Sequence, residues 1–256
     1  MRPILVQLGP FTVYSYGFML AVGLLAALAV IKGRGEPVGL TGDRLYNLFL
    51  GAVLSSLAGA RLTYLALNGV PLAAFFDFGH GGLSFFGGLA FGTIGLAALA
   101  AYWRIAFMDL ADAIVPGLAL GEAITRLGCD IFGKPASGWW AVWRNGASVY
   151  PVQLYSFALN FGIYLFLRVY RPRYAGQAGA VYLILLGVTR FVLEFVREGA
   201  TLAGPLTWGH VAAVLALLAG SILFVTRRGR PAKVTGGNFR VLDFMPLLLA
   251  PMYFIS

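Results

Sequence analysis

The chain has 256 residues, of which 59% are hydrophobic and 11% charged, and its mean hydropathy is +0.81, which predicts an integral membrane protein because soluble domains average roughly 45–50% apolar residues. A single cysteine, Cys129, and two histidines, His80 and His210, exclude an internal disulfide and argue against a metal site built from these residues. The net charge of +9 lies in short clusters between apolar segments, which indicates topology signals and not a nucleic-acid-binding face.

Seven stretches are long enough to cross the hydrocarbon core of a bilayer, which takes roughly 20 apolar residues. They are residues 12–31, 46–68, 83–103, 110–128, 152–168, 177–196 and 207–226. The fourth differs from the others because it contains Asp112, Glu122 and Arg126. We therefore predict an all-α integral membrane protein with about seven transmembrane helices, in which residues 1–226 form the membrane domain and residues 227–256 a basic cytoplasmic tail with a short apolar end.

The distribution of Lys and Arg predicts the orientation, because cytoplasmic loops carry the excess of basic residues. If the N-terminus is outside, twelve basic residues are cytoplasmic, four are outside, and the other three of the 19 lie within spans. The N-terminus is therefore expected outside and the C-terminus in the cytoplasm. Residues 129–151, between the fourth and fifth spans, contain three Trp, whose rings favour the headgroup region, so we predict an arm on the outer, periplasmic side.

Charged side chains inside a bilayer cost roughly 2.5–3.5 kcal/mol each to insert, so each asks for a partner or a function. In TRFVLEFVREG, Arg190 and Glu194 are four residues apart and Arg197 follows three residues later, which places all three on one helix stripe. Either Arg190 and Glu194 neutralise each other as an ion pair, or the stripe faces a water-filled cavity that holds a polar substrate group. Arg197, nearer the outer surface, is expected to anchor the helix end.

Three further polar residues lie near the outer ends of spans. Arg126, in EAITRLGCDIFGKP, suits bidentate binding of a phosphodiester at headgroup depth, and the alternative is an ion pair with Glu122. Arg61, in AGARLTY, is either a further interior charge or a helix-packing anchor. Tyr16, in the first span, is either an aromatic-belt residue or a member of the site.

The stretch HGGLSFFGG, residues 80–88, places two glycine pairs around a short apolar run. Close helix packing explains Gly87 and Gly88. The pair at 81 and 82 indicates a non-helical loop at membrane depth, which is tolerated where it is buried in protein or lines a cavity.

Seven segments occur in a characteristic order, namely YSYGFMLAVG, GARLTY, GGLSFFGG, RLGC with GKP, PVQLY, RFVLEFVRE and WGH. In these segments and their order the chain resembles the prolipoprotein diacylglyceryl transferase family. The resemblance implies a bacterial inner-membrane enzyme that moves the diacylglyceryl group of phosphatidylglycerol onto the lipobox cysteine thiol of a prolipoprotein signal peptide. It implies release of glycerol 1-phosphate, no cofactor, and partners that are membrane lipid and prolipoprotein, with no nucleic acid.

Carried onto this sequence, the resemblance also implies a set of site residues. The catalytic residues are expected to be Arg190, Glu194 and Tyr16, and the phosphatidylglycerol-binding residues Arg126, Arg190, Gly87, Gly88 and Gly133, with His80, Arg61 and Cys129 as secondary candidates. Arg126 and Arg190 are expected to hold the phosphate and Glu194 to orient Arg190, because guanidinium groups stabilise charge that develops on a leaving phosphate ester. The base that converts the attacking thiol to a thiolate is left unassigned.

The chain also departs from the family pattern. Phe86 stands where many members have His or Tyr, and a phenyl ring neither accepts nor donates a proton. Other departures are His80 for an acidic residue, Thr125 for Gly, Cys129 for Asn, Tyr150 for His and Ser156 for an acidic residue. Besides an active transferase, the sequence therefore leaves open a paralogue that binds phospholipid but has lost or changed its acceptor. A non-enzymatic, transporter-like lipid-handling protein is the third reading, and the absence of an evident inverted repeat argues against it.

Overall fold

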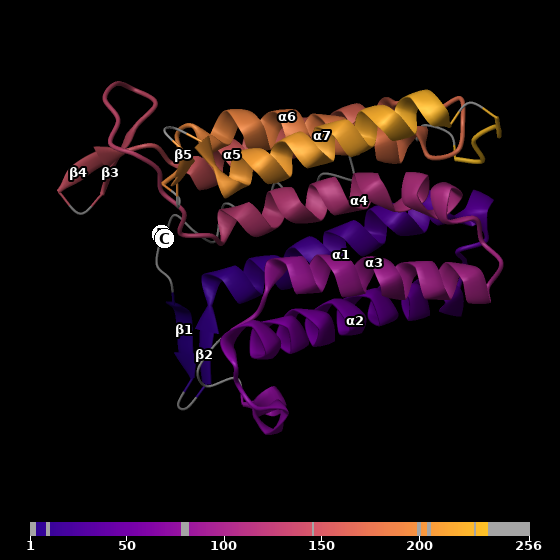
Figure 1. Ribbon diagram of the computed structural model, residues 1–256, viewed down its shortest axis with the longest axis horizontal. Helices are drawn as coiled ribbons and strands as arrows, with labels where there is room; N and C mark the ends of the chain where they lie inside the picture. The colour runs from indigo at the N-terminus through magenta and orange to yellow at the C-terminus, as the bar shows by residue number, and fades with distance from the viewer. Residues whose placement is uncertain are drawn as a thin grey trace.

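The computed structural model describes residues 4–8, 11–77, 82–144, 146–198, 201–203, 206–227 and 229–234. Within them, seven long α-helices run side by side (Figure 1). They are α1 (Ser15–Gly35), α2 (Asp43–Asn68), α3 (Phe85–Tyr102), α4 (Phe107–Leu127), α5 (Val152–Val169), α6 (Gln177–Glu194) and α7 (Trp208–Thr226). Each overlaps one predicted span and ends within a few residues of it, so the all-α membrane fold is confirmed.

Helix α4 differs from the other six, which are long and apolar enough to cross a membrane. It is of similar length but carries Asp109, Asp112, Glu122 and Arg126. It packs on α1, α5 and α6, and much of its surface is buried. Asp112 shows how its charges are accommodated, because the carboxylate accepts hydrogen bonds from the backbone N–H groups of Gly176 (2.7 Å) and Gly179 (3.0 Å) at the start of α6. The exact number of spans and the N-outside orientation stay predictions.

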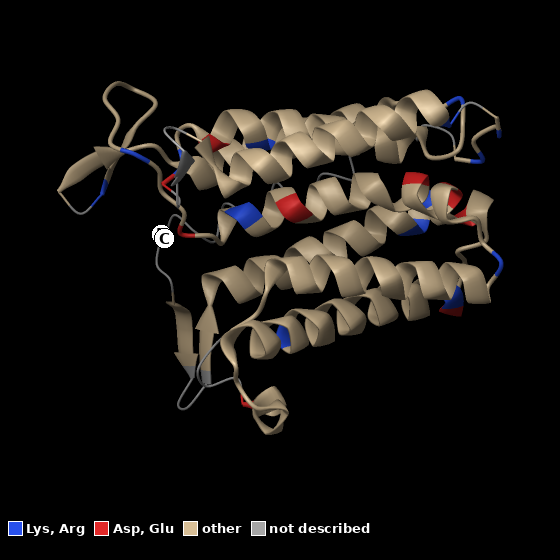
Figure 2. Ribbon diagram, in the orientation of Figure 1, with Lys and Arg blue, Asp and Glu red and all other residues tan. Residues whose placement is uncertain are grey.

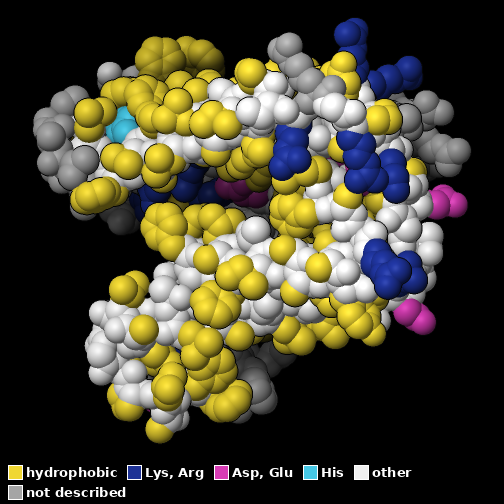
Figure 3. Space-filling view, turned by 45° about the vertical axis from the view of Figure 1, so that its right-hand side comes forward, with side chains coloured by type: hydrophobic (Ala, Val, Ile, Leu, Met, Phe, Trp, Pro, Cys, Tyr) yellow, Lys and Arg dark blue, Asp and Glu magenta, His cyan; other side chains and the backbone are white. Residues whose placement is uncertain are grey.

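Two hydrophobic cores hold the bundle together. The first joins α1, α4, α5 and α6 around Met19, Leu120, Tyr164 and Leu167. The second joins α2 and α3 to α1 and α4, and its members are Ile31, Val38, Leu40, Leu45, Leu48, Ala100, Leu110, Ala113, Ile114 and Val234. These residues lie at one end of their helices, so the α2–α3 pair is attached to the bundle mainly at that end. Figure 3 shows a hollow between two parts of the bundle, with charged side chains inside it and hydrophobic side chains on its rims.

Short strands lie at the end where α1 begins (Figure 1). Three antiparallel pairs are formed by β1 (Ile4–Leu8) with β2 (Phe11–Tyr14), β3 (Val142–Arg144) with β4 (Ala147–Val149), and β5 (Thr201–Ala203) with β6 (Leu206–Thr207). β3 and β4 form the predicted arm, which projects from the bundle, and Trp139 and Trp143 on it are exposed. Two 3-10 helices, η1 (Glu36–Val38) and η2 (Leu72–Phe76), complete the described elements.

Basic residues gather at the opposite end of the bundle (Figure 2). Lys32 and Arg34 lie in the last turn of α1, Arg168 in the last turn of α5, and Arg227 follows α7. This is the end that the charge distribution assigns to the cytoplasm. The residues from 235 onward, including the predicted short apolar end of the tail, lie outside the described residues.

Candidate active site

Charged residues of α4, of α6 and of the segment just after α6 form one cluster, which we call the polar cluster, made of Glu122, Arg126, Arg190, Glu194 and Arg197. Arg190 interacts electrostatically with all four of the others, two of which come from α4. Figure 2 shows the acidic and basic positions of α4 and α6 near the same end of the bundle. Arg126 and Arg190, which belong to two separate motifs and are 64 positions apart in the sequence, are therefore brought together.

Arg126 forms the ion pair that was its predicted alternative. Its Nη2 donates to Oε1 of Glu122 at 2.8 Å, one helical turn away, and both side chains are partly buried. The hydroxyl of Tyr182 lies 3.5 Å from the other oxygen of Glu122. A guanidinium has five N–H donors, so this ion pair leaves Arg126 able to bind a phosphate as well.

Arg190 does not form the ion pair with Glu194 that the sequence suggested. Within the described part of the chain, its guanidinium makes no hydrogen bond or ion pair, although the side chain is only partly exposed. Glu194 is the last residue of α6, and its carboxylate turns instead toward the start of α7 and toward Arg197, whose Nη1 lies 3.7 Å away. Glu194 makes no ion pair with Arg190 among the described residues, and its role in orienting Arg190 stays a prediction. Arg197, which was expected to anchor the helix end, also forms an ion pair with Glu194.

The carboxylate of Glu194 is held by residues at the start of α7, a contact that the sequence did not predict. Glu194 is 5% exposed, and the hydroxyl of Thr207 donates to its Oε1 at 2.8 Å. Thr207 also caps α7, and its backbone N–H donates to Nδ1 of His210 at 3.1 Å. Gly209 faces the carboxylate, because a Cβ atom there would lie 2.3 Å from Cδ of Glu194. The sequence signal was a Thr three residues before a polar side chain at the start of an apolar run, which is a capping pattern.

Comparison with known proteins identifies the family. A family model described as prolipoprotein diacylglyceryl transferase matches residues 3–226. The chain belongs to this family. A phosphatidylglycerol–prolipoprotein diacylglyceryl transferase of Chromohalobacter salexigens is 32% identical to it, over 90% of this chain and 93% of that protein. One of Bordetella parapertussis is 30% identical over 90% and 97%, and a second, numbered 2, of Clostridium perfringens is 28% identical over 92% and 99%.

Tyr16 and Cys129 lie next to the polar cluster of this transferase-family protein. Tyr16, in the first turn of α1, is half exposed and interacts electrostatically with Arg126 and Cys129. Cys129 is buried, and its Sγ lies 3.5 Å from the carbonyl oxygen of Thr125. Burial raises the pKa of the Cys129 thiol, which disfavours the reactive thiolate form.

Gly133 connects the arm to the end of α6. Its backbone N–H donates to the carbonyl oxygen of Tyr150 at 2.8 Å, and it forms an isolated β-bridge with Arg197. A Cβ atom on Gly133 would lie 2.1 Å from the carbonyl oxygen of Val196. The absence of a side chain at 133 thus lets the arm approach the residues that follow Glu194.

Arg61 is a packing anchor, which was one of its two predicted roles. The buried guanidinium donates to backbone carbonyl oxygens of the loop between α2 and α3, namely those of Ala74 (2.8 Å), Phe75 (3.1 Å), Asp77 and Gly82 (3.0 Å). Gly82 has a φ of +96°, and a Cβ atom there would lie 2.1 Å from the ring of Tyr64. Gly82 is thus packed against α2, whereas the residues of η2 are exposed or half-buried, so a loop buried at membrane depth stays a prediction. His80 and Gly81 lie outside the described residues.

The first turn of α3 has two buried glycines, Gly87 and Gly88, and two exposed aromatic rings, Phe85 and Phe86. Gly87 and Gly88 are buried against α2, and a Cβ atom on Gly87 would lie 2.6 Å from the carbonyl oxygen of Gly59. Gly87 and Gly88 therefore allow α2 and α3 to pack closely, and their role in binding phosphatidylglycerol stays a prediction. Phe86 is 68% exposed and its ring packs edge-on against Phe85. No proton-transfer group stands at position 86.

Proposed function

We propose that this protein transfers the diacylglyceryl group of phosphatidylglycerol to the lipobox cysteine thiol of prolipoprotein signal peptides, in the bacterial cell inner membrane. The observation that carries the proposal is Arg190, a guanidinium inside a transmembrane bundle that makes no hydrogen bond or ion pair with any described residue and lies beside a second guanidinium on Arg126. A charge in this setting calls for a counter-ion. The phosphodiester of phosphatidylglycerol supplies one negative charge and two non-bridging oxygens, which a guanidinium binds through two parallel hydrogen bonds.

The polar cluster supports the reaction chemistry in two ways. When the thiol gives up its proton, its sulfur forms a thioether bond with the glyceryl carbon, and the bond between that carbon and the phosphate oxygen breaks. The leaving glycerol 1-phosphate takes the electron pair and gains negative charge, which Arg126 and Arg190 stabilise. Glu194 holds Arg197 at the same level through their ion pair, so the cluster keeps three guanidinium groups near the phosphate.

The surroundings of the polar cluster suit two substrates that are both held in a membrane. The hollow in Figure 3 is rimmed by hydrophobic side chains, so acyl chains and the apolar part of a signal peptide remain in contact with apolar surface. Tyr16, half exposed beside Arg126, provides a hydroxyl at the level where headgroups lie. We assign it to binding or positioning of the phosphatidylglycerol headgroup.

Complementation tests the proposal. A bacterium depleted of its own transferase is supplied with this protein, and lipidation of a model prolipoprotein is scored. We expect lipidation with the unaltered chain, none with Arg126→Ala or Arg190→Ala, and full lipidation with Arg44→Ala, a matched control in which an exposed arginine at the basic end of the bundle is lost. No lipidation by a well-expressed, membrane-inserted protein would overturn the proposal.

A second function, phospholipid binding without transfer to this acceptor, is favoured by Phe86, which takes no proton. The two functions separate in the Phe86→His variant. If the protein is a transferase slowed by Phe86, the variant lipidates faster, whereas a transferase that uses another base shows no change. A chain that binds phosphatidylglycerol but gives no lipidation with either residue at 86 would establish the second function.

A further inference from the structure

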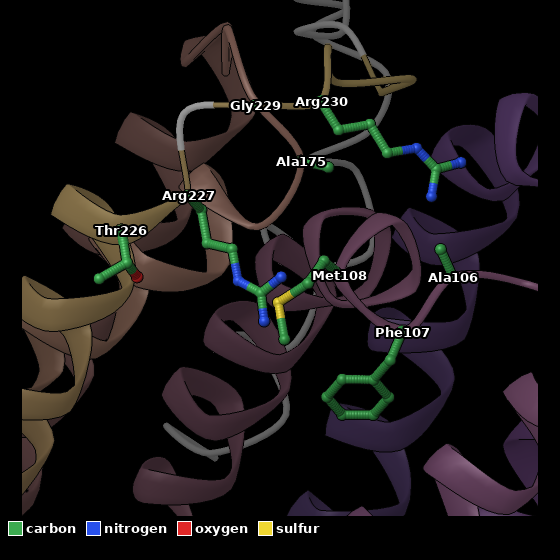
Figure 4. Close-up of a pocket in the computed structure, with 8 residues that line it drawn as sticks. All are labelled: Ala106, Phe107, Met108, Ala175, Thr226, Arg227, Gly229 and Arg230. Carbon is green, nitrogen blue, oxygen red and sulfur yellow. The ribbon is translucent and has the colours of Figure 1, made fainter.

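A cavity of about 520 Å³ lies at the end of the bundle opposite the polar cluster (Figure 4). Three elements meet around it: the start of α4, the loop before α6, and the end of α7 with the residues after it. Its lining consists of Ala106, Phe107, Met108, Ala175, Thr226, Arg227, Gly229 and Arg230. None of these residues belongs to the proposed active site.

The two arginines of the cavity differ in their partners. Nη2 of Arg230 lies 3.2 Å from Oδ2 of Asp109, a carboxylate that is 1% exposed, so the charge of Arg230 is compensated. The guanidinium of Arg227 makes no ion pair or hydrogen bond with any described residue. Figure 4 shows it extending toward Met108, whereas the guanidinium of Arg230 lies nearer Ala106. The cavity therefore combines a largely apolar wall with one arginine, Arg227, whose charge is paired with no residue that the structure describes.

The position of the cavity relates it to the lipid leaflet at this end. Thr226 is the last residue of α7, and Val225 and Ile222 just before it are each 60% exposed, so an apolar helix surface leads up to the cavity. Helix α4 begins at the wall without a side-chain cap at Ala106, and the acidic residue of its first turn, Asp109, is the one that pairs with Arg230. Basic pockets between transmembrane helices at a membrane boundary bind anionic phospholipid headgroups.

We propose that this cavity binds the headgroup phosphate of an anionic phospholipid from the leaflet at the basic end of the bundle, with Arg227 as the phosphate-binding side chain. One acyl chain of that lipid runs along the exposed apolar surface at the end of α7. The bound lipid links the start of α4 to the end of α7, and it is distinct from the phosphatidylglycerol consumed at the polar cluster. Because it binds only the folded protein, it stabilises that protein by mass action.

The full chain in lipid nanodiscs tests this site. Apparent Tm is measured in phosphatidylcholine alone and with phosphatidylserine added, because phosphatidylserine is anionic without being the proposed substrate. We expect phosphatidylserine to raise Tm by about 3 °C. Arg227→Gln should lose most of that increase, and Arg44→Gln, which removes an exposed arginine at the same end but outside the cavity, should keep it. Native mass spectrometry should show one tightly bound phosphatidylserine fewer on Arg227→Gln than on Arg44→Gln.

Three results would overturn the proposal. Phosphatidylserine that raises Tm equally in Arg227→Gln and in the unaltered chain would show that the effect is unspecific. If inorganic phosphate added to phosphatidylcholine nanodiscs raises Tm as much as phosphatidylserine does, the site binds a soluble anion and not a lipid. An unaltered chain that gains no stability from phosphatidylserine would show that the cavity binds none. If Arg227→Gln does not fold, Arg227→Lys keeps the charge without the bidentate fork and should show a reduced but measurable gain.

Discussion

A Cβ atom on Gly209 would lie 2.3 Å from Cδ of Glu194, so the carboxylate fits against the start of α7 only because residue 209 has no side chain. The hydroxyl of Thr207 holds the same carboxylate from two residues earlier, at 2.8 Å. The WGH segment thus has a physical role, which is to position the carboxylate of Glu194 beside Arg197. If Glu194 belongs to the active site, residues at the start of α7 act on the reaction through it.

Replacing Gly209 with Ala should displace Glu194 and lower the rate of lipidation. A misplacement of about 1 Å in an active site costs up to roughly 100-fold in rate, so we expect a loss of tenfold or more in kcat/KM with little change in the amount of folded protein. Gly162→Ala is the matched control, because a Cβ atom at Gly162 meets nothing within 4 Å. Equal rates of lipidation in the two variants would contradict the claim that Gly209 positions the carboxylate of Glu194.

The hydroxyl of Thr207 should matter more than its methyl group. Thr207→Val leaves Glu194 without its closest donor, and a hydrogen bond to a charged group contributes roughly 1.5–3 kcal/mol. Thr207→Ser keeps that donor and the α7 cap, so it should retain most of the lipidation rate. The measurement is kcat with Tm recorded in parallel, since loss of a cap alone lowers stability by about 1 kcal/mol. If Thr207→Ser is as slow as Thr207→Val, the hydroxyl of Thr207 does not contribute to the lipidation rate.

Arg190→Lys should separate charge from geometry at the proposed phosphate site. Lysine keeps the positive charge but cannot form the two parallel hydrogen bonds of a guanidinium with a phosphate. We expect KM for phosphatidylglycerol to rise and kcat to fall, with Arg190→Ala worse in both. Steady-state kinetics over a range of phosphatidylglycerol mole fractions in mixed micelles measures the two parameters. Unaltered kinetics in the Lys variant would indicate that Arg190 contributes only charge.

Arg61→Met should destabilise the protein without touching the polar cluster. The change leaves four backbone carbonyl oxygens of the α2–α3 loop without their donor, which we expect to cost roughly 3 kcal/mol or more. In a chain of this size that lowers Tm by roughly 6–12 °C. Limited proteolysis should show new cleavage within residues 71–84, and cleavage elsewhere first would argue against a local role.

The arm should loosen in acid through a single ion pair. Both terminal nitrogens of Arg144 donate to the carboxylate of Asp130, and these hydrogen bonds lower the pKa of Asp130 below its ordinary value. A lowered pKa means that the stabilisation is complete above the ordinary Asp pKa of about 4 and is lost as pH falls through the lowered value. Because both side chains are about one-third exposed, the contribution is roughly 0.5 kcal/mol.

Pepsin, which is active in acid, provides the measurement. Cleavage of the arm within residues 136–148 should accelerate as pH falls from about 4 to 2, relative to cleavage elsewhere in the chain. Asp130→Asn, which cannot ionise, should be cleaved faster at pH 4 and should show a smaller change with pH. The same pH dependence in both proteins would rule out this ion pair as the cause.

Sequence reasoning succeeded where one segment alone decides the outcome. The helix positions, the arm and the packing role of Gly87 and Gly88 follow from apolar length, Trp content and small residues. It failed where two segments meet. The spacing of Arg190 and Glu194 correctly placed both at the end of one helix, but an i,i+4 spacing permits an ion pair without requiring one. Glu194 ends α6, so its side chain was free to meet the start of α7 instead.

The amino-acid sequence by itself determined that this is a helical membrane protein of the transferase family with arginines inside the bundle, because a bilayer imposes length, apolarity and internal hydrogen bonding on each segment separately. Only the tertiary structure decided which ion-pair or hydrogen-bond partner each charge has: Glu122 for Arg126, Arg197 and Thr207 for Glu194, and none among the described residues for Arg190. The physical reason is that ion pairs and hydrogen bonds act over a few ångströms, so they depend on how the helices pack against one another.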